Sequence, residues 1–416
     1  MRVYLDHAAT TPMPPEVLDA YVSALGLVGN PSSIHTQGQQ AKRLLEDARA
    51  AVADAVGATP VEVTFTSGGT EAINLAVKGL WWRAGGNRVL ATRAEHHATI
   101  DALEWLERHE GAVIEWIPVD AVGRIDLAAL EAALGPDVAL VTTLWANNEV
   151  GTVQPIAQIV ALAAAHGVPV HADGVAAFGQ LPIDFAASGL AALSVSAHKV
   201  GGPVGVGALI VARSIEVEPL LHGGSQQRFR SGTPDAAGAH AFGVAAARVT
   251  AGLAARAARL EALRDHLAAG IRAVVPSAVL RGDPVDRLPG TVHATFPGCD
   301  GDSLLFLLDA AGFSVSTGSA CQAGVPEASH VLLAMGLSEA EARGALRFSL
   351  SDRTTEAELD ALLEALPGVV ERASAAGLAR ASQLQPREAL PRNSAPCCST
   401  PRSSASRSSA ADRCGG

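Results

Sequence analysis

In the stretch Glu62-Val63-Thr64-Phe65-Thr66-Ser67-Gly68-Gly69-Thr70-Glu71, a β-branched run is followed by a pair of glycines. An alanine-rich amphipathic segment comes next. The β-branched run is typical of a strand, and the glycine pair before a periodic apolar segment is typical of a turn that starts a helix. We therefore predict a strand over residues 62–65 and a helix over residues 71–83, which together form one βα unit.

The same alternation continues to about residue 211. Short apolar runs are separated by helical segments such as residues 99–108 and 156–166. This pattern favours an α/β fold with a mostly parallel sheet. The seven predicted strands are residues 62–65, 88–92, 113–117, 139–144, 169–172, 193–196 and 208–211.

A helical stretch over residues 236–274 leads into a second region, which we expect to be a smaller α+β domain. Its predicted elements are a strand (292–296), a helix (303–311), a strand (345–350) and a helix (356–373). Beyond about Leu378 the composition turns to Ser, Pro and Arg without apolar periodicity, which is typical of disorder. The expected organisation is a large α/β domain over residues 13–255, a small domain from residues 1–12 and 256–378, and a disordered tail over residues 379–416.

Composition and charge exclude several classes of function. The chain has 416 residues, enough for roughly two to three structural units. Its formal net charge of −11 argues against a nucleic-acid-binding surface, which needs clustered Lys and Arg. No apolar run is long enough to span a membrane and the start of the chain lacks a signal-peptide pattern, so we expect a cytoplasmic protein.

Five cysteines are too few for a disulfide framework in a chain of this length, and their spacing predicts no resident metal site. Cys321 differs from the others because it lies in a small-residue stretch, Ser316-Thr317-Gly318-Ser319-Ala320-Cys321-Gln322-Ala323-Gly324. Such a stretch is able to expose a thiol, as a nucleophile requires, whereas a buried inert cysteine is the alternative. We expect Cys299 to be structural.

Lys199 follows a predicted strand in Ser196-Ala197-His198-Lys199, and a glycine-rich segment comes next. A lysine at a strand end is accessible to a ligand, which a Schiff-base lysine requires because its amine has to be held near a carbonyl. This pattern alone is also compatible with an ordinary surface lysine.

Two further features follow strand ends. The turn over residues 66–71 offers backbone N–H groups and a helix dipole to an anion, although a simple N-cap turn explains it equally well. Asp173 could pair with the pyridine nitrogen of pyridoxal phosphate (PLP), although an Asp there is more often a turn or cap residue. With Lys199, these features gather at the carboxyl edge of the sheet, where open α/β sheets bind ligands.

Ordered motifs from Tyr4 to about Ala373 resemble the cysteine desulfurases of the nitrogen-fixation and iron–sulfur-cluster type, within the fold-type I PLP enzymes of the class V aminotransferase family. Beside the features above, the motifs are Tyr4–Pro12, Asn30–His35, Glu95–His97, Asn147–Gly151, Arg230–Pro234 and Arg347–Leu350. The resemblance implies the PLP-dependent transferase fold type I, with PLP as the cofactor.

The resemblance also implies the site residues. The cofactor-binding residues would be Gly69, Thr70, His96, Asn148, Asp173, Ser196, His198, Lys199 and Thr233, the last reaching the phosphate from the neighbouring subunit of a homodimer. The substrate-binding residues would be Asn30, Asn148 and Arg347. The catalytic residues would be Lys199, His96 and Cys321.

The implied reaction takes sulfur from L-cysteine, leaves L-alanine and forms a persulfide on Cys321. The sulfur would pass to an acceptor protein such as an iron–sulfur scaffold or a tRNA-thiolation enzyme. No resident metal is implied, apart from transient ligation of an iron–sulfur cluster by Cys321.

Two alternatives stay open from the sequence. A selenocysteine lyase or another class V PLP enzyme would share the fold and the lysine, because a fold does not fix the substrate. Ala176 stands three residues after Asp173, where the family usually has a Gln that contacts the cofactor. This departure leaves room for a desulfurase-like protein with weak catalysis that serves as a scaffold.

Overall fold

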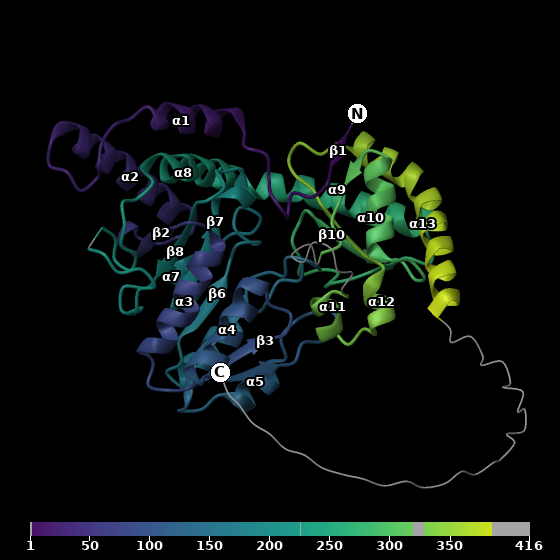
Figure 1. Ribbon diagram of the computed structural model, residues 1–416, viewed down its shortest axis with the longest axis horizontal. Coiled ribbons are helices and arrows are strands. Elements are labelled where there is room, and N and C mark those ends of the chain that lie inside the picture. Colours follow the sequence, from purple (N-terminus) through teal and green to yellow (C-terminus); the bar gives the residue numbers. More distant parts are fainter. Residues whose placement is uncertain (1, 225, 319–327, 385–416) are drawn as a thin grey trace, which may run out of the picture.

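The computed structural model describes residues 2–224, 226–318 and 328–384, with residues 376–384 as backbone alone. Two layered units lie side by side in Figure 1, one coloured purple to teal and the other green to yellow. The first is built on a seven-stranded sheet and the second on a three-stranded sheet. Among the described residues, no helix is both long enough and apolar enough to cross a membrane.

The seven-stranded sheet confirms the predicted α/β class, and each of its strands lies within one residue of its predicted bounds. The strand order is β2-β8-β7-β6-β5-β3-β4, and β8 runs antiparallel to both of its neighbours while the other pairs are parallel. The strands are β2 (Val63–Thr66), β3 (Arg88–Thr92), β4 (Val113–Ile117), β5 (Val138–Leu144), β6 (Val170–Asp173), β7 (Ala192–Ser196) and β8 (Gly207–Val211).

Helices bury both faces of this sheet. In β8, Ala208 and Ile210 face the core shared with α2 (Thr36–Ala55) and α8 (Ala236–Thr250), whereas Leu209 and Val211 face α3 (Gly69–Arg83) and α4 (His97–Glu110). Burial on both faces explains why the strands read as nearly continuous apolar runs rather than alternating ones. The remaining helices of this unit are α1 (Pro15–Leu25), α5 (Leu127–Ala133), α6 (Ile156–Ala165), α7 (Phe185–Ser188) and the 3-10 turns η1 (Pro60–Glu62) and η2 (Ala197–Val200).

The second unit has its own apolar core. Its antiparallel sheet has the order β12-β10-β9, and in β10 Val292 and Ala294 point into the core while His293 points to the other face. A two-stranded parallel sheet, β1-β11, brings the start of the chain to this unit. Its elements are β1 (Val3–Tyr4), α9 (Leu253–Val274), β9 (Val279–Leu280), β10 (Thr291–Thr295), α10 (Gly301–Ala310), β11 (Phe313–Ser314), α11 (His330–Ala334), α12 (Glu339–Arg343), β12 (Ala345–Ser349) and α13 (Glu356–Leu384).

Two expectations about helices were wrong at their boundaries. The stretch over residues 236–274 is two helices, because the chain breaks at Ala251 and Gly252, and glycine is the weakest helix former after proline. Helix α13 was expected over residues 356–373 but continues to Leu384, beyond the change in composition near Leu378. Residues 385–416 of the expected tail lie outside the described residues.

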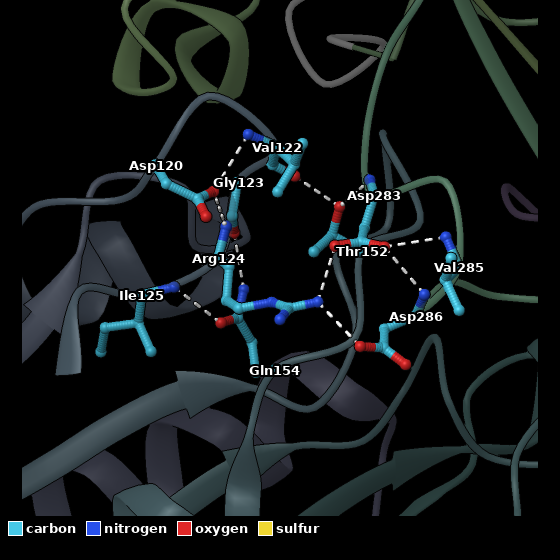
Figure 2. Close-up of polar contacts among 10 residues, drawn as sticks. All are labelled: Asp120, Val122, Gly123, Arg124, Ile125, Thr152, Gln154, Asp283, Val285 and Asp286. Carbon is cyan, nitrogen blue, oxygen red and sulfur yellow. Dashed lines mark hydrogen bonds and ion pairs between the residues drawn. The ribbon is translucent and has the colours of Figure 1, made fainter.

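A polar network ties the two units together (Figure 2). Arg124 Nη2 bonds to Asp283 Oδ2 at 2.6 Å and to Asp286 Oδ2 at 2.9 Å. The Asp283 amide donates to Thr152 Oγ1 at 2.9 Å, in the loop that follows β5. The segment before β10 is thereby fixed to two loops of the seven-stranded sheet.

Candidate active site

The carboxyl ends of the parallel strands carry most of the predicted site residues. Strand β6 ends at Asp173, and β7 ends at Ser196, directly before the turn η2 that contains Lys199. The Lys199 charge is close enough to influence the pKa values of Asp173, His96 and His198. The structure therefore brings these residues together at one edge of the sheet, as expected for an open α/β fold.

Lys199 is half-buried under the first residues of the chain. Its Nζ donates to the carbonyl oxygens of Ala8 and of Ala9, the latter at 3.0 Å. The neighbouring His198 accepts from the Thr11 amide through its own carbonyl, and its ring Nδ1 lies 3.4 Å from Thr10 Oγ1. The N-terminal segment thus forms one wall around the lysine.

Asp173 is a buried carboxylate beside this lysine. Its Oδ1 accepts from the Val175 amide at 2.9 Å. Burial raises the pKa of Asp173 to about 6, and the Val175 N–H and the Lys199 charge act against that rise. The carboxylate is therefore still charged at pH 7 and able to pair with a cation.

His171 lies on the same face of β6, two residues before Asp173. Its ring nitrogens bond to Thr142 Oγ1 and Ser194 Oγ, both at 2.9 Å. Burial lowers the pKa of His171 to about 3, so the imidazole is neutral. Two hydroxyls on neighbouring strands thus fix a neutral ring beneath the carboxylate.

His96 is the N-cap of α4. Its Nδ1 accepts from the Ala98 amide at 3.0 Å, which leaves Nε2 to carry the proton of the neutral ring. Burial, followed by the Lys199 charge, lowers the pKa of His96 to about 4. The cap therefore holds a neutral imidazole in a defined orientation.

Glu95 is a residue of this site that sequence reasoning did not single out, although it stands in the Glu95-His96-His97 motif. It is buried, and Thr92 Oγ1 donates to its Oε1 at 2.9 Å, while Oε2 has no partner among the described residues. Burial, with a smaller contribution from Asp173, raises the pKa of Glu95 to about 8. At pH 7 this carboxyl is mainly protonated.

A small-residue cradle precedes α3. A Cβ on Gly69 would lie 2.9 Å from Val175 Cγ2 and 3.4 Å from Ser196 Cβ, so only glycine permits this close approach. The Ser196 hydroxyl is buried and has no partner among the described residues. An unpaired donor beside a helix N-terminus suits an anionic group. Thr70 is exposed in the first turn of the same helix.

Glu71 supports this cradle, and sequence reasoning did not single it out as a site residue. Its Oε2 accepts from the Ser67 amide at 2.6 Å, and its Oε1 bonds to Arg230 Nε at 3.0 Å. The Arg230 guanidinium and the Ser67 N–H help to keep the pKa of Glu71 below its usual value despite burial. The ion pair ties the cradle to the segment that contains Thr233.

Arg347 and Asn148 meet on the other side of the site. Arg347, in β12, donates from Nη1 to the Asn148 carbonyl at 2.9 Å and from Nη2 to Asp6 Oδ1 at 3.0 Å. Within the described part of the chain, Arg347 Nε and Asn148 Oδ1 are buried without partners. Asp6 was missed as a site residue, although it lies in the Tyr4–Pro12 motif. The guanidinium is oriented by two fixed oxygens and retains donor capacity for a carboxylate.

Three predicted residues do not join this group. Asn30 and Thr233 are exposed, and Asn30 Oδ1 accepts from the Ser32 amide at 2.9 Å. Cys321 lies outside the described residues. In the ranges that the structure does describe, no three His, Cys, Asp or Glu side chains are grouped as a metal site.

The residues present fit PLP. An anion cradle with an unpaired hydroxyl, a charged buried carboxylate and a lysine amine are the three groups that this cofactor requires for its phosphate, pyridine nitrogen and aldehyde. The chain also matches the family model described as aminotransferase class-V over residues 3–362.

Known proteins similar to this chain carry related names. An IscS-like cysteine desulfurase of Mycobacterium tuberculosis is 52% identical, covering 91% of this chain and 98% of that protein. The cysteine desulfurase NifS of Azotobacter vinelandii is 41% identical, covering 88% and 92%. A solved NifS-like protein superposes with a TM-score of 0.84 at 33% identity, covering 89% of this chain and all of that one. The chain belongs to the cysteine desulfurases of the class V aminotransferase family.

Proposed function

We propose that this protein removes sulfur from L-cysteine, releases L-alanine and places the sulfur on Cys321. The observation that supports this proposal most is the pairing of Lys199 with Asp173 at the carboxyl edge of the seven-stranded sheet. Arg347 of β12 is linked to this edge through the Asn148 carbonyl and through Asp6, which precedes the lysine contacts Ala8 and Ala9 in the chain. The similar cysteine desulfurases, at 38–52% identity over most of the chain, support the same function. A solved structure titled SspA in complex with cysteine has a TM-score of 0.74 at 33% identity.

PLP supplies an aldehyde for the substrate amine and an electron sink for its α-carbon. Lys199 would hold the cofactor covalently and afterwards move protons at the substrate α-carbon. Asp173, still charged at pH 7, would hold the proton of the pyridine nitrogen. His96, neutral and with its proton on Nε2, would contact the ring and assist proton transfer.

The remaining groups would bind the two ends of the ligands. Gly69, Thr70, Ser196 and His198 would hold the phosphate, consistent with the unpaired Ser196 hydroxyl. Arg347 and Asn148 would hold the substrate carboxylate. The Cys321 thiolate would form a bond to the substrate sulfur as the carbon–sulfur bond breaks, and the carbon left behind would take up a proton to give alanine.

We also propose a homodimer in which Thr233 of the partner subunit reaches the phosphate. Helix α1 supports this assembly, since Leu18, Val22 and Leu25 lie on one face and are 48–61% exposed, and the nearby Ile34 is 93% exposed. Contiguous exposed apolar side chains of this kind mark an interface. A Val22→Glu variant should be monomeric by light scattering and should bind PLP more weakly, whereas a dimeric variant would refute the proposed contact.

We propose in the same way the sulfur acceptor, the cellular location and the domain division. The sulfur acceptor would be an iron–sulfur scaffold or a tRNA-thiolation enzyme, and the cytoplasmic location stays a prediction for cell fractionation to test. Two separate apolar cores support the division into a large domain over residues 13–255 and a small domain from residues 1–12 and 256–378. Limited proteolysis should cut between them first.

Two measurements test the function. Borohydride treatment of the holoenzyme followed by peptide mapping should place the reduced pyridoxyl group on Lys199. Cysteine-dependent production of alanine and sulfide should be lost in Cys321→Ala. An adduct on another residue, or a variant that makes sulfide as fast as the parent, would refute the corresponding role.

A further inference from the structure

Two residues that flank residues 319–327 contact one and the same carboxylate. Ser329 Oγ donates to Glu149 Oε2 at 2.5 Å. On the other flank, Gly318 has a φ of +85°, and a Cβ there would lie 2.8 Å from Glu149 Oε2, so its backbone packs directly against that oxygen. Glu149 is only 1% exposed. The two ends of the segment that contains Cys321 therefore meet at a single buried oxygen atom.

The backbone of Glu149 is held beside the candidate active site by hydrogen bonds. Its amide donates to Asn147 Oδ1 at 2.9 Å, and Asn147 Nδ2 donates to the Ala94 carbonyl at 3.0 Å. The next residue back along the chain is Asn148, whose carbonyl accepts from Arg347. The backbone of Glu149 is thus anchored one residue from the oxygen that orients the guanidinium.

Each flank is also tied to a different wall of the site. Upstream, Ser316 exchanges backbone hydrogen bonds with Arg347, at 2.7 and 3.2 Å, and its hydroxyl accepts from the Gly318 amide at 3.2 Å. Downstream, His330 Nε2 bonds to the Glu95 carbonyl at 2.8 Å, next to His96. These contacts connect the two flanks to the arginine and to the neutral imidazole respectively.

We propose that Glu149 is a positioning residue for sulfur transfer, which acts by fixing Gly318 and Ser329 relative to the substrate site. This inference rests on the proposed role of Cys321. Three peptide units span at most roughly 11 Å, so the place where Gly318 is anchored limits where a thiol three residues later is able to reach. A misplacement of about 1 Å costs on the order of 100-fold in rate.

The chain offers closely matched controls. Ser338 Oγ donates to Glu341 Oε2 at 2.6 Å in an exposed capping box of α12, which is the same kind of contact away from the site. The Ser329 and Ser338 hydroxyls also both cap a helix. Glu341→Gln and Ser338→Ala therefore reproduce the loss of charge and of cap without touching Gly318 or Ser329.

The test compares two readouts in single turnovers of the holoenzyme: the absorbance change when cysteine is added, and mass-spectrometric detection of a persulfide on the Cys321 peptide. Glu149→Gln and Ser329→Ala should slow persulfide formation about 10- to 100-fold while the absorbance change stays within about twofold of the parent. The double variant should be no slower than Glu149→Gln, because the two residues act as one unit. Both controls should match the parent.

Persulfide formation at the parent rate in Glu149→Gln would overturn the inference, and so would equal slowing of both readouts. If Glu149→Gln does not fold, Ser329→Ala decides by the same criteria, because it removes a single hydroxyl. A parent enzyme that releases alanine without a persulfide on Cys321 would overturn the proposed role of Cys321, and this inference with it.

Discussion

Arg124 and Asp283 form an ion pair of 2.6 Å between the loop after β4 and the segment before β10, and the Asp283 side chain is only 12% exposed (Figure 2). Replacing Arg124 by Met removes the charge that faces Asp283, although Asp283 Oδ1 still accepts from the Val285 and Asp286 amides at 2.8 Å. We expect a loss of about 1–3 kcal/mol in the free energy of unfolding, measured by urea denaturation.

The control for this prediction is Asp309→Asn at the ion pair with Arg2, where both side chains are more than half exposed. That change should stay within about 0.5 kcal/mol of the parent, because exposed ion pairs contribute little. Equal losses in the free energy of unfolding for Arg124→Met and Asp309→Asn would mean that the Arg124 network does not couple the two units.

Asp6 orients Arg347, so Asp6→Asn should weaken binding of the substrate carboxylate. The neutral amide retains an oxygen acceptor but loses the charge-assisted bond at 3.0 Å. We expect KM for cysteine to rise about tenfold with a smaller change in kcat, as measured by alanine production. An unchanged KM would show that the Asn148 carbonyl alone orients the guanidinium.

Glu95 gives a pH dependence of stability with a defined sign. Its pKa is raised to about 8 in the folded protein, so its contribution is present below the pKa of the unfolded chain and is lost as pH rises toward 8. Gln resembles the protonated carboxyl and does not titrate. Glu95→Gln should therefore gain stability relative to the parent between pH 5 and pH 8, as measured by urea denaturation of the cofactor-free protein. A pH-independent difference would contradict the raised pKa.

Ser196→Ala should separate cofactor binding from stability. The buried hydroxyl has no partner among the described residues, so its removal should leave the cofactor-free protein as stable as before or more stable. PLP affinity should fall about tenfold, since a bond to a charged phosphate is lost.

The matched control is Ser194→Ala, two residues earlier in β7. The Ser194 hydroxyl bonds to His171 Nε2 at 2.9 Å, so its loss should lower stability while PLP affinity changes little. Equilibrium dialysis against PLP and urea denaturation measure the two quantities. If Ser196→Ala and Ser194→Ala changed PLP affinity and stability in the same way, a phosphate contact at Ser196 would be refuted.

The seven strands were predictable because each is a short run rich in apolar and β-branched residues. Six of them are buried along nearly their whole length, whereas the edge strand β4 is only partly buried. The break at Gly252 was missed because the residues on both sides of it have the same helix-forming composition. The position of Lys199 at a strand end followed from local pattern alone. The Asp6–Arg347 pair could not be found in this way, because it joins positions 341 residues apart and depends on how the two units pack.

Residues 3–11 contact two cationic side chains of the site. Strand β1 pairs with β11, Asp6 bonds to Arg347, and the Ala8 and Ala9 carbonyls accept from Lys199. An enzyme shortened by its first eleven residues would lose the carbonyl acceptors of the lysine and the counter-ion of the arginine in one cut. Expression tags and fusion partners placed ahead of Val3 therefore need a long flexible spacer, since anything that pulls on this strand acts directly on the reaction centre.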